Sequence, residues 1–167
     1  WVDEAYGRLE TAGYTVTSAY TAVKNPEKTK FIYRDRLWSG ADMVALGVAS
    51  FGHLGGIHYQ NLTHIDQYCE TTESEGSVVR RALLTTDEER FVRELILQWK
   101  LGVVRPSYFR DKFGIDILAR FSEVFEEWRA SGDLIAGEDE LRLSRAALLR
   151  VDSMLYRFFL PQHQDLD

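Results

Sequence analysis

Cysteine is nearly absent from this sequence, in which Cys69 is the one example among 167 residues. A single thiol excludes an internal disulfide bond and a metal site built from cysteines alone, and it favours a reducing, cytoplasmic setting. No apolar run approaches the roughly 18–20 residues that cross a bilayer, and no signal-peptide pattern opens the chain. Positive charge is in deficit, because 20 Lys and Arg stand against 26 Asp and Glu and leave a net charge of −6. This balance disfavours general binding to nucleic acids or anionic membranes.

What the chain does contain is enough apolar material for a folded core. Hydrophobic residues make up 45%, aromatic residues 13% and charged residues 28%, which is typical of globular proteins and not of disordered chains. The length suits one ordinary domain or two small ones. The sequence starts at Trp1, without a methionine, and enters a helical pattern at once. We interpret it as part of a longer polypeptide.

The beginning of the chain predicts a helix followed by strands. Apolar residues at helical spacing over 2–12 stop at Gly13, which favours a helix with a glycine after its last turn. Residues 14–23 are rich in β-branched and aromatic side chains and predict a strand. Residues 28–33 predict a second, shorter strand.

An apolar run at 42–50 is followed by a glycine-rich stretch at 51–56. A short apolar run with small residues fits a strand buried on both faces, as in a parallel sheet. Ligands of α/β sheets bind at the ends of such strands, where small residues let the backbone approach a cofactor. Small residues also allow tight packing under a helix, so the residues by themselves favour neither interpretation. The pattern up to residue 56 indicates the end of an α/β architecture.

Beyond residue 62 the pattern becomes mostly helical. The predicted elements are a short helix over 63–70, a polar linker over 71–76, a helix opened by a capping box of Thr86 and Glu89 and ended at Gly102, helices opened by Pro106 and Asp116, a hairpin over 134–143 that turns at 137–139, and a last helix capped by Ser144. Three helices, a hairpin and a helix is the order of a winged-helix-like unit. The chain is therefore predicted to form two units that break near residues 71–85.

The winged-helix order raises the hypothesis of nucleic-acid binding through the third helix. That predicted helix, over 116–130, carries two arginines, but it also carries Asp116, Glu123, Glu126 and Glu127. Phosphate contacts dominate affinity for nucleic acids, so an acidic helix is poorly suited to this role. A packing role for the unit is the favoured interpretation.

Two other chemistries are weakly indicated. His53, His58, His64 and Cys69 lie close together in the sequence, but their spacing matches no usual zinc pattern, and scattered histidines are more often substrate contacts or ordinary polar residues. The segment around Ser50 is similar to a nucleophile elbow, except that its first glycine stands one residue too far away. No metal ligand and no hydrolase site is predicted.

Several stretches together resemble one known family. They are Gly13-Tyr14, Tyr33–Trp38, Asp42–Gly52, Tyr59–Asn61, Tyr68, Thr86 with Glu89, Lys100–Gly102, Phe113–Asp116 and Gly132–Leu134. These stretches are similar to the C-terminal part of the oxygen-independent coproporphyrinogen III oxidase family, whose members are radical S-adenosylmethionine (SAM) enzymes. The likeness extends over nearly the whole chain.

The resemblance implies an α+β fold in two parts. Residues 1–75 would be the C-terminal strands and helix of a partial (β/α) radical SAM barrel, including a strand–loop that lines its cavity. Residues 76–167 would form a mostly helical, winged-helix-like accessory domain that helps to cover the barrel mouth. The family's Cys-x3-Cys-x2-Cys signature, which holds a [4Fe–4S] cluster, is absent. The cluster and most of the site for the cleaved SAM would then lie in a missing N-terminal part of the same polypeptide.

The resemblance also implies site residues. The strand–loop near bound SAM would consist of Gly47, Val48, Ala49, Ser50 and Phe51. Phe51 stands where coproporphyrinogen oxidases have a smaller aliphatic residue, and Tyr33-Arg-Asp35 replaces a His-x-Asn element of the family. We predict that Tyr33, His53 and Asn61 contact the substrate.

The function implied is that of the C-terminal part of an enzyme of tetrapyrrole (heme) metabolism. This part would help to bind a tetrapyrrole or other small molecule and would shield the radical from water, while the chain alone would not be an enzyme. A non-enzymatic heme-binding or heme-transfer protein on the same scaffold is the alternative. A winged-helix nucleic-acid module is the third hypothesis. No nucleic-acid partner and no membrane are expected.

Overall fold

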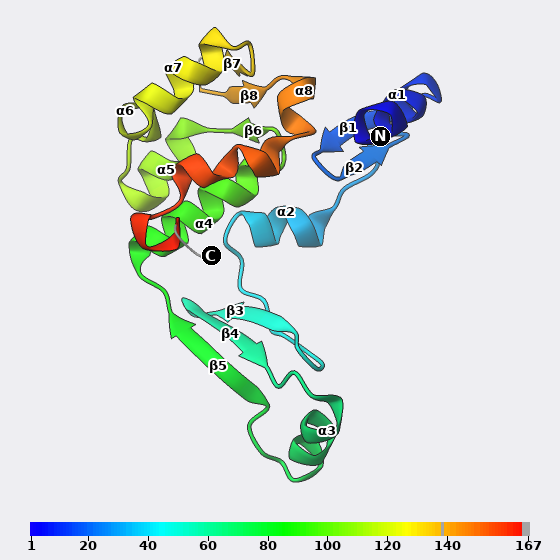
Figure 1. Cartoon of the computed structure of the whole chain (residues 1–167), viewed down its shortest axis with the longest axis vertical. Helices are drawn as coiled ribbons and strands as arrows, with labels where there is room; N and C mark the ends of the chain where they lie inside the picture. The colour runs from blue at the N-terminus through cyan, green and yellow to red at the C-terminus, as the bar shows by residue number, and fades with distance from the viewer. Residues whose placement is uncertain (138, 165–167) are drawn as a thin grey trace. The chain divides into compact units, whose positions relative to one another are not determined.

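The computed structural model describes residues 1–137 and 139–164, which divide into two compact units (Figure 1). Unit 1 combines Trp1–Ile32 with the described residues from Phe91 onward, and unit 2 is Tyr33–Arg90. Both contain helices and small antiparallel sheets, so the fold is mixed α+β. No described helix has the length and apolar content needed to cross a membrane.

Unit 1 starts with a helix and a hairpin. Helix α1 (Val2–Thr11) ends as predicted, because Gly13 adopts a φ of +82°. The single strand predicted over 14–23 is wrong: β1 (Thr15–Ser18) and β2 (Thr21–Val23) pair antiparallel. The chain reverses at Ala19 and Tyr20, where the Tyr20 N–H donates to Ser18 Oγ at 3.2 Å. Such a local bond lets serine stabilise a turn within a β-branched run.

Helix α4 (Asp87–Trp99) begins at the predicted capping box, which is confirmed. The Glu89 N–H donates to Thr86 Oγ1 at 3.1 Å, and the Thr86 N–H donates to the Glu89 carboxylate at 2.8 Å. These reciprocal bonds satisfy backbone donors that have no partner inside the helix. A turn at Gly102, with a φ of +78°, follows the helix.

The rest of unit 1 follows the predicted order, apart from a short strand at Val103–Val104 that was not predicted and two differences in the helices. The predicted third helix is interrupted at Phe121, and the last helix covers one turn before the chain continues in 3-10 turns. The predicted turn over 137–139 includes residue 138, which lies outside the described residues. The elements are β6 (Val103–Val104), α5 (Pro106–Phe113), α6 (Ile117–Arg120), α7 (Ser122–Ala130), β7 (Leu134–Ala136), β8 (Leu141–Leu143), α8 (Arg145–Leu148), η1 (Val151–Ser153), η2 (Leu155–Phe158) and η3 (Pro161–His163), and the strands pair in the order β6-β8-β7.

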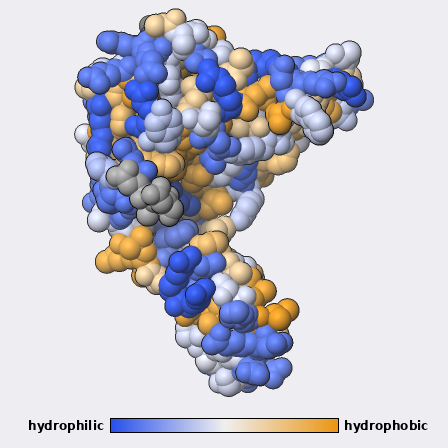
Figure 2. Space-filling model, in the orientation of Figure 1, coloured by the Kyte–Doolittle hydropathy of each residue, from blue (hydrophilic) through white to orange (hydrophobic). Residues whose placement is uncertain are grey.

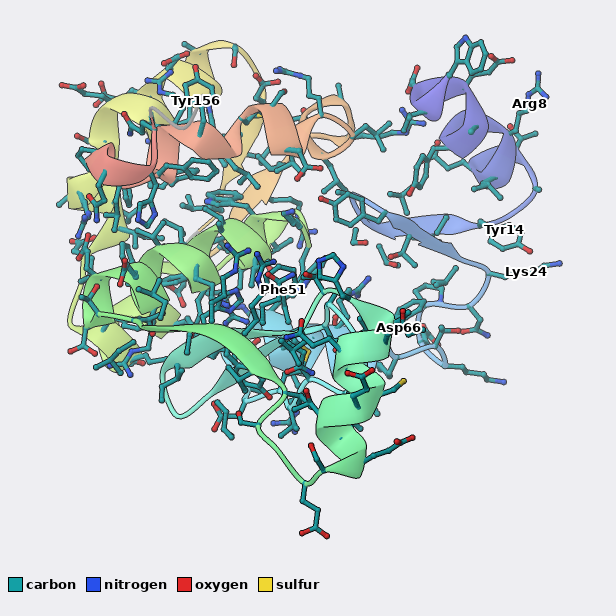
Figure 3. All side chains as sticks on the ribbon, turned by 60° about the horizontal axis from the view of Figure 1, so that its bottom comes forward. Arg8, Tyr14, Lys24, Phe51, Asp66 and Tyr156 are labelled. Carbon is teal, nitrogen blue, oxygen red and sulfur yellow. The ribbon has the colours of Figure 1, made fainter. Side chains whose placement is uncertain are left out.

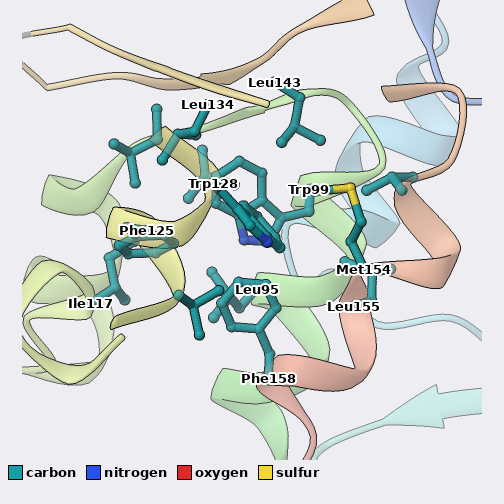
Figure 4. Packing of buried hydrophobic residues seen from close by; sticks show 14 of the residues in the cluster. Leu95, Trp99, Ile117, Phe125, Trp128, Leu134, Leu143, Met154, Leu155 and Phe158 are labelled. Atoms are coloured by element: carbon teal, nitrogen blue, oxygen red, sulfur yellow. The ribbon is translucent and has the colours of Figure 1, made fainter. Parts of the chain in front are cut away.

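Aromatic side chains fill the core of unit 1 (Figure 4). The ring centroid of Trp99 lies 5.4 Å from that of Trp128, 6.0 Å from that of Phe125 and 6.1 Å from that of Phe158. Each ring comes from a different position along α4, α7 or η2, so their packing joins these elements. Burial of large aromatic surfaces supplies most of the driving force for such a small unit.

An ion pair between the buried Asp133 and the half-exposed Arg150 closes the loop before β7. Arg150 Nη2 lies 2.6 Å from both carboxylate oxygens of Asp133, and Ser131 Oγ donates to the same carboxylate at 2.8 Å. Burial raises the pKa of Asp133, but the hydrogen bonds from Arg150 and Ser131 outweigh it, so the pKa lies below its ordinary value. Because the pKa of Asp133 is lower in the folded state than in the unfolded state, its ionised carboxylate stabilises the fold at pH values above the unfolded-state pKa. This contribution disappears as the pH falls through the folded-state pKa.

We therefore expect Asp133→Asn to lower the free energy of unfolding by about 1–2 kcal/mol at pH 7, since Arg150 is half-exposed and partly solvated. Urea unfolding at pH 7 and below pH 4 measures this difference, which should shrink on acidification. The exposed Asp111 on α5 provides a control, Asp111→Asn, that should change stability little at either pH. If Asp133→Asn lowers the free energy of unfolding equally at both pH values, the effect does not come from the charge of Asp133.

Unit 2 is a three-stranded antiparallel sheet with two helices. Strand β3 (Phe51–Leu54) pairs with β4 (Ile57–Asn61), which pairs with β5 (Val79–Leu84). The predicted helix over 63–70 is confirmed as α3 (Ile65–Glu73). Every residue of β5 is exposed, and apolar surface is visible among polar surface on unit 2 (Figure 2).

Two strands predicted in this region are wrong. Residues 28–33 include a turn closed by the Thr29 N–H on Asn25 O at 2.9 Å, and helix α2 (Ile32–Trp38) begins before their end. Residues 42–50 do not form a strand, and no described strands pair in parallel. Gly47 and Ala49 have positive φ angles, which an extended strand does not allow. An apolar run by itself does not distinguish these outcomes.

The predicted break near residues 71–85 lies inside unit 2, because β5 returns to the sheet there. The assignment of 1–75 to a barrel and of 76–167 to an accessory domain concerns the longer polypeptide, and it stays a prediction. Residues 165–167 of the second segment lie outside the described residues.

Candidate functional site

Residues 43–50 form an irregular loop beside the sheet of unit 2. Met43 pairs with His53 through two backbone hydrogen bonds of 2.6 and 2.8 Å, and the chain then leaves the sheet. Gly47 and Ala49 adopt φ angles of +98° and +59°. A positive φ is ordinary for glycine and strained for alanine. Such strain persists where the surroundings impose it, and it concentrates at functional sites.

Three side chains from outside the loop hold its backbone. Asn61 Nδ2 donates to the carbonyl oxygens of Ala45 at 3.3 Å and Gly47 at 3.0 Å. The Ala45 N–H donates to the Tyr59 hydroxyl at 2.9 Å, and the Gly47 N–H donates to the Tyr68 hydroxyl at 3.1 Å. Asn61 is only 1% exposed, so its two bonds form away from competing water. Strand β4 and helix α3 therefore impose the shape of the loop.

The end of the loop is held in the same way. Gln60 Nε2 donates to Ala49 O at 3.2 Å, and the Ala49 N–H donates to Leu62 O at 2.7 Å. Ser50 Oγ donates to Leu46 O at 2.8 Å. The backbone groups of Ala49 and the carbonyl of Leu46 therefore already bond within the protein. The side chain of Leu46 is 83% exposed.

Gly52 allows this arrangement by its lack of a side chain. A Cβ at Gly52 would overlap the ring of Tyr59, the residue opposite it in the β3–β4 ladder. The ring of Tyr59 therefore crosses Gly52 on its way to Ala45. Glycine is required here for close packing, since its φ is not positive.

The structure keeps the predicted cofactor-contacting residues together. The second half of the loop 43–50 consists of Gly47, Val48, Ala49 and Ser50, and strand β3 begins at Phe51. Phe51, which is labelled in Figure 3, is half-exposed. Its ring stacks on that of His58 with centroids 5.7 Å apart. Their contact with a cofactor stays a prediction.

The predicted substrate-contacting residues occupy three different settings. Tyr33 lies on α2, is 70% exposed, and points its hydroxyl at Met43 Sδ, 2.7 Å away, at the start of the loop. His53 is buried in β3, with its ring 6.1 Å from that of His58. Asn61 uses its amide nitrogen to hold the loop. The substrate role of all three stays a prediction, and for Asn61 the structure shows a different, positioning contact.

Sequence reasoning placed Tyr59, Gln60 and Tyr68 among the stretches that resemble the family, but it did not predict that they hold the loop. The alternation of side chains along β4 is the sequence signal for this role. Residues two apart on a strand share a face, and Tyr59 and Asn61 both contact the loop. The sequence gives no indication of which segment such a face meets.

The described residues contain no group of three or more His, Cys, Asp and Glu side chains that could hold a metal ion. Cys69 is exposed on α3 and supplies at most one thiolate. A [4Fe–4S] cluster needs three or four cysteine ligands, so this part of the chain does not fit one.

Comparison with known proteins identifies a related sequence and a related structure. The chain is 28% identical over 127 residues to oxygen-independent coproporphyrinogen III oxidase of Pseudomonas aeruginosa, a match that covers 72% of this chain and 27% of that protein. Its fold matches a solved structure described as coproporphyrinogen III oxidase (HemN) from Escherichia coli, a radical SAM enzyme, with a TM-score of 0.74 and 14% identity. That match covers 94% of this chain and 39% of the solved one. No protein-family model matches the chain.

Proposed function

We propose, from the homology of this chain to a part of oxygen-independent coproporphyrinogen III oxidase, that it forms one wall of the active-site cavity of a radical SAM enzyme. The chain spans about a quarter of the length of the curated relative, so the activity belongs to a longer polypeptide. The observation that carries the proposal is the loop 45–50, whose strained backbone is held in place by Tyr59, Asn61 and Tyr68. The substrate class we propose is a tetrapyrrole.

The held loop suits the wall of a cavity that must exclude water. SAM, reductively cleaved at a [4Fe–4S] cluster, supplies radical chemistry that needs a closed, largely apolar surrounding. Gly47, Val48 and Ala49 would contact SAM through Cα atoms and small apolar groups, because the carbonyls of Gly47 and Ala49 already accept hydrogen bonds within the protein. The cluster would be held by the remainder of the polypeptide, which is the partner we propose for this chain.

Unit 1 fits a covering role better than a nucleic-acid role. The order of α4, β6, α5, α7, β7 and β8 supports a winged-helix-like arrangement. Helix α7 exposes Glu123, Glu126 and Glu127, and a helix of this charge repels phosphates. We propose that this region packs against protein and does not bind DNA or RNA.

The direct test uses the complete native protein, reconstituted anaerobically with iron and sulfide. Formation of 5′-deoxyadenosine from SAM is measured with and without coproporphyrinogen III or heme. Formation stimulated by either tetrapyrrole supports the proposed function. A bound cluster and tight heme uptake without SAM cleavage would instead favour a heme-binding or heme-transfer protein.

In the same assay we expect Gly47→Val to reduce 5′-deoxyadenosine formation by about 100-fold or more, because a β-branched residue does not tolerate the positive φ and displaces the loop. Gly132→Val is a matched control, since Gly132 also has a positive φ and open space around it, but lies in unit 1. Circular dichroism should show the helices beyond residue 86 unchanged in Gly47→Val. Unchanged turnover in this variant would remove the cavity assignment.

A further inference from the structure

A cavity of about 310 Å³ lies on one face of the unit 2 sheet. Its volume is near the lower limit of ligand cavities, which is roughly 300 Å³, so it suits one ring and its substituent and not a large ligand as a whole. The residues that line it are Phe51, His58, Tyr59, Gln60, Arg81, Ala82 and Leu83. All of them belong to β3, β4 or β5.

The strand register places the rings of Phe51 and His58 and the side chain of Leu83 on one face, where they form the floor of the cavity. Gln60 lies opposite Phe51 on one side and Arg81 on the other, and His58 lies opposite Leu83. Side chains two apart along a strand share a face, so these residues point the same way. The rings of Phe51 and His58 are nearly parallel, 12° apart, and Leu83 is 53% exposed. A planar, apolar group can pack on this floor.

One positively charged side chain, Arg81, lies at the edge of the cavity floor. Arg81 Nε donates to Gln60 Oε1 at 2.9 Å, and Gln60 donates in turn to Ala49 O of the held loop. Arg81 is the only charged residue of the described lining, and its guanidinium is in no ion pair among the described residues. The bond to Gln60 uses one of five N–H donors, which leaves the terminal nitrogens for a ligand.

We propose that this cavity binds a carboxylate attached to a flat apolar ring, with Arg81 on the carboxylate and the ring over Phe51 and His58. Arginine binds carboxylates through two parallel hydrogen bonds, and its side chain here is oriented in advance by Gln60. The identity of the ligand rests on the proposed function: in a tetrapyrrole it is one pyrrole with its propionate arm. SAM also carries a carboxylate and a flat ring, so the test separates the two sources.

The test is a fluorescence titration of the complete native protein with coproporphyrin III, in the absence of SAM and reductant. Coproporphyrin III tetramethyl ester is the probe without carboxylates, and S-adenosylhomocysteine, followed by calorimetry, represents SAM. The variants are Arg81→Gln and Arg81→Lys. Arg80→Gln is the matched control, because Arg80 precedes Arg81 on β5 and donates to Thr63 Oγ1 instead of pointing into the cavity.

We expect Arg81→Gln to raise the Kd for coproporphyrin III roughly 10- to 100-fold, as for a lost charged hydrogen bond. Arg81→Lys should show a smaller loss, and Arg80→Gln a change below about twofold. The ester should bind the unaltered protein as weakly as coproporphyrin III binds Arg81→Gln. Dependence on Arg81 for S-adenosylhomocysteine alone would support the carboxylate site and assign it to SAM.

Equal weakening by Arg80→Gln and Arg81→Gln would overturn the proposal, since it would reveal only an effect of overall charge. Binding that is insensitive to Arg81, equal binding of acid and ester, or no binding of either carboxylate probe would also overturn it. The titration contains no SAM and needs no turnover. Arg81-dependent porphyrin binding in a protein that does not cleave SAM would therefore retain this site while rejecting the proposed radical enzyme.

Discussion

Trp99→Ala is expected to lower the free energy of unfolding of unit 1 by about 3–5 kcal/mol, the range for removing a large buried aromatic side chain. Trp99 is fully buried, and its indole contacts the rings of Phe125, Trp128 and Phe158 (Figure 4). Alanine would leave a cavity at the point where α4, α7 and η2 meet, because the neighbouring aromatic rings are already packed in the core. Urea unfolding of the chain, followed by near-ultraviolet circular dichroism, measures the loss.

Trp99→Phe distinguishes packing from hydrogen bonding. The Trp99 indole N–H is buried without a hydrogen-bond partner in the described part of the chain, so phenylalanine removes ring volume but no bond. We expect Trp99→Phe to lower the free energy of unfolding much less than Trp99→Ala does. Tyr156→Ala, at a side chain that is 57% exposed, should change stability by less than about 0.5 kcal/mol. A loss below about 1 kcal/mol in Trp99→Ala would show that this ring is not the centre of the core.

Asn61→Asp is expected to release the loop of unit 2 while preserving the size of the side chain. The amide nitrogen that donates to Ala45 O and Gly47 O would become a carboxylate oxygen facing two carbonyl oxygens in a buried place. Two lost hydrogen bonds and the repulsion together amount to about 3 kcal/mol of local stability. Amide hydrogen exchange of Ala45, Gly47 and Ala49 should therefore accelerate by about 100-fold.

Gln60→Glu provides a matched control for that variant. It makes the same chemical change one residue away, and it also removes a donor to the loop, the bond to Ala49 O. Its new carboxylate, however, would lie beside Arg81, which compensates the charge. Exchange at Ala45 and Gly47 should therefore stay near the rate of the unaltered protein. Equal exchange rates in Asn61→Asp and the unaltered protein would mean that Asn61 does not hold the loop.

Local signals in the sequence predict where several of the helices begin. The capping box of Thr86 and Glu89 and the Asp116 and Ser144 caps all act through bonds between residues that are close in sequence. Neighbouring side chains and backbone groups determine these ends, so the pattern contains the necessary information.

The loop at 43–50 shows why other parts of the structure could not be predicted from local signals. Its apolar run matches a buried strand, yet its conformation depends on Tyr59, Asn61 and Tyr68, which are 14 to 21 residues away from the groups they bind. Periodicity describes which side of an element is apolar and is silent about which distant side chain donates a bond. The resemblance predicts that 47–51 contact a cofactor, which stays a prediction, while the contacts that hold this loop are visible only in the structure.

The close approach of Gly52 and Tyr59 limits the order in which this sequence can change. A side chain at position 52 needs a smaller residue at 59, because the two would otherwise overlap. A smaller residue at 59 removes the hydroxyl that accepts from Ala45, so the loop loses a contact before position 52 gains anything. Neither a substitution at position 52 alone nor one at position 59 alone therefore leaves the structure undisturbed. Divergence at this pair therefore proceeds through a weakened intermediate or by paired replacement, and a homologue with a larger residue at position 52 should also have exchanged its tyrosine.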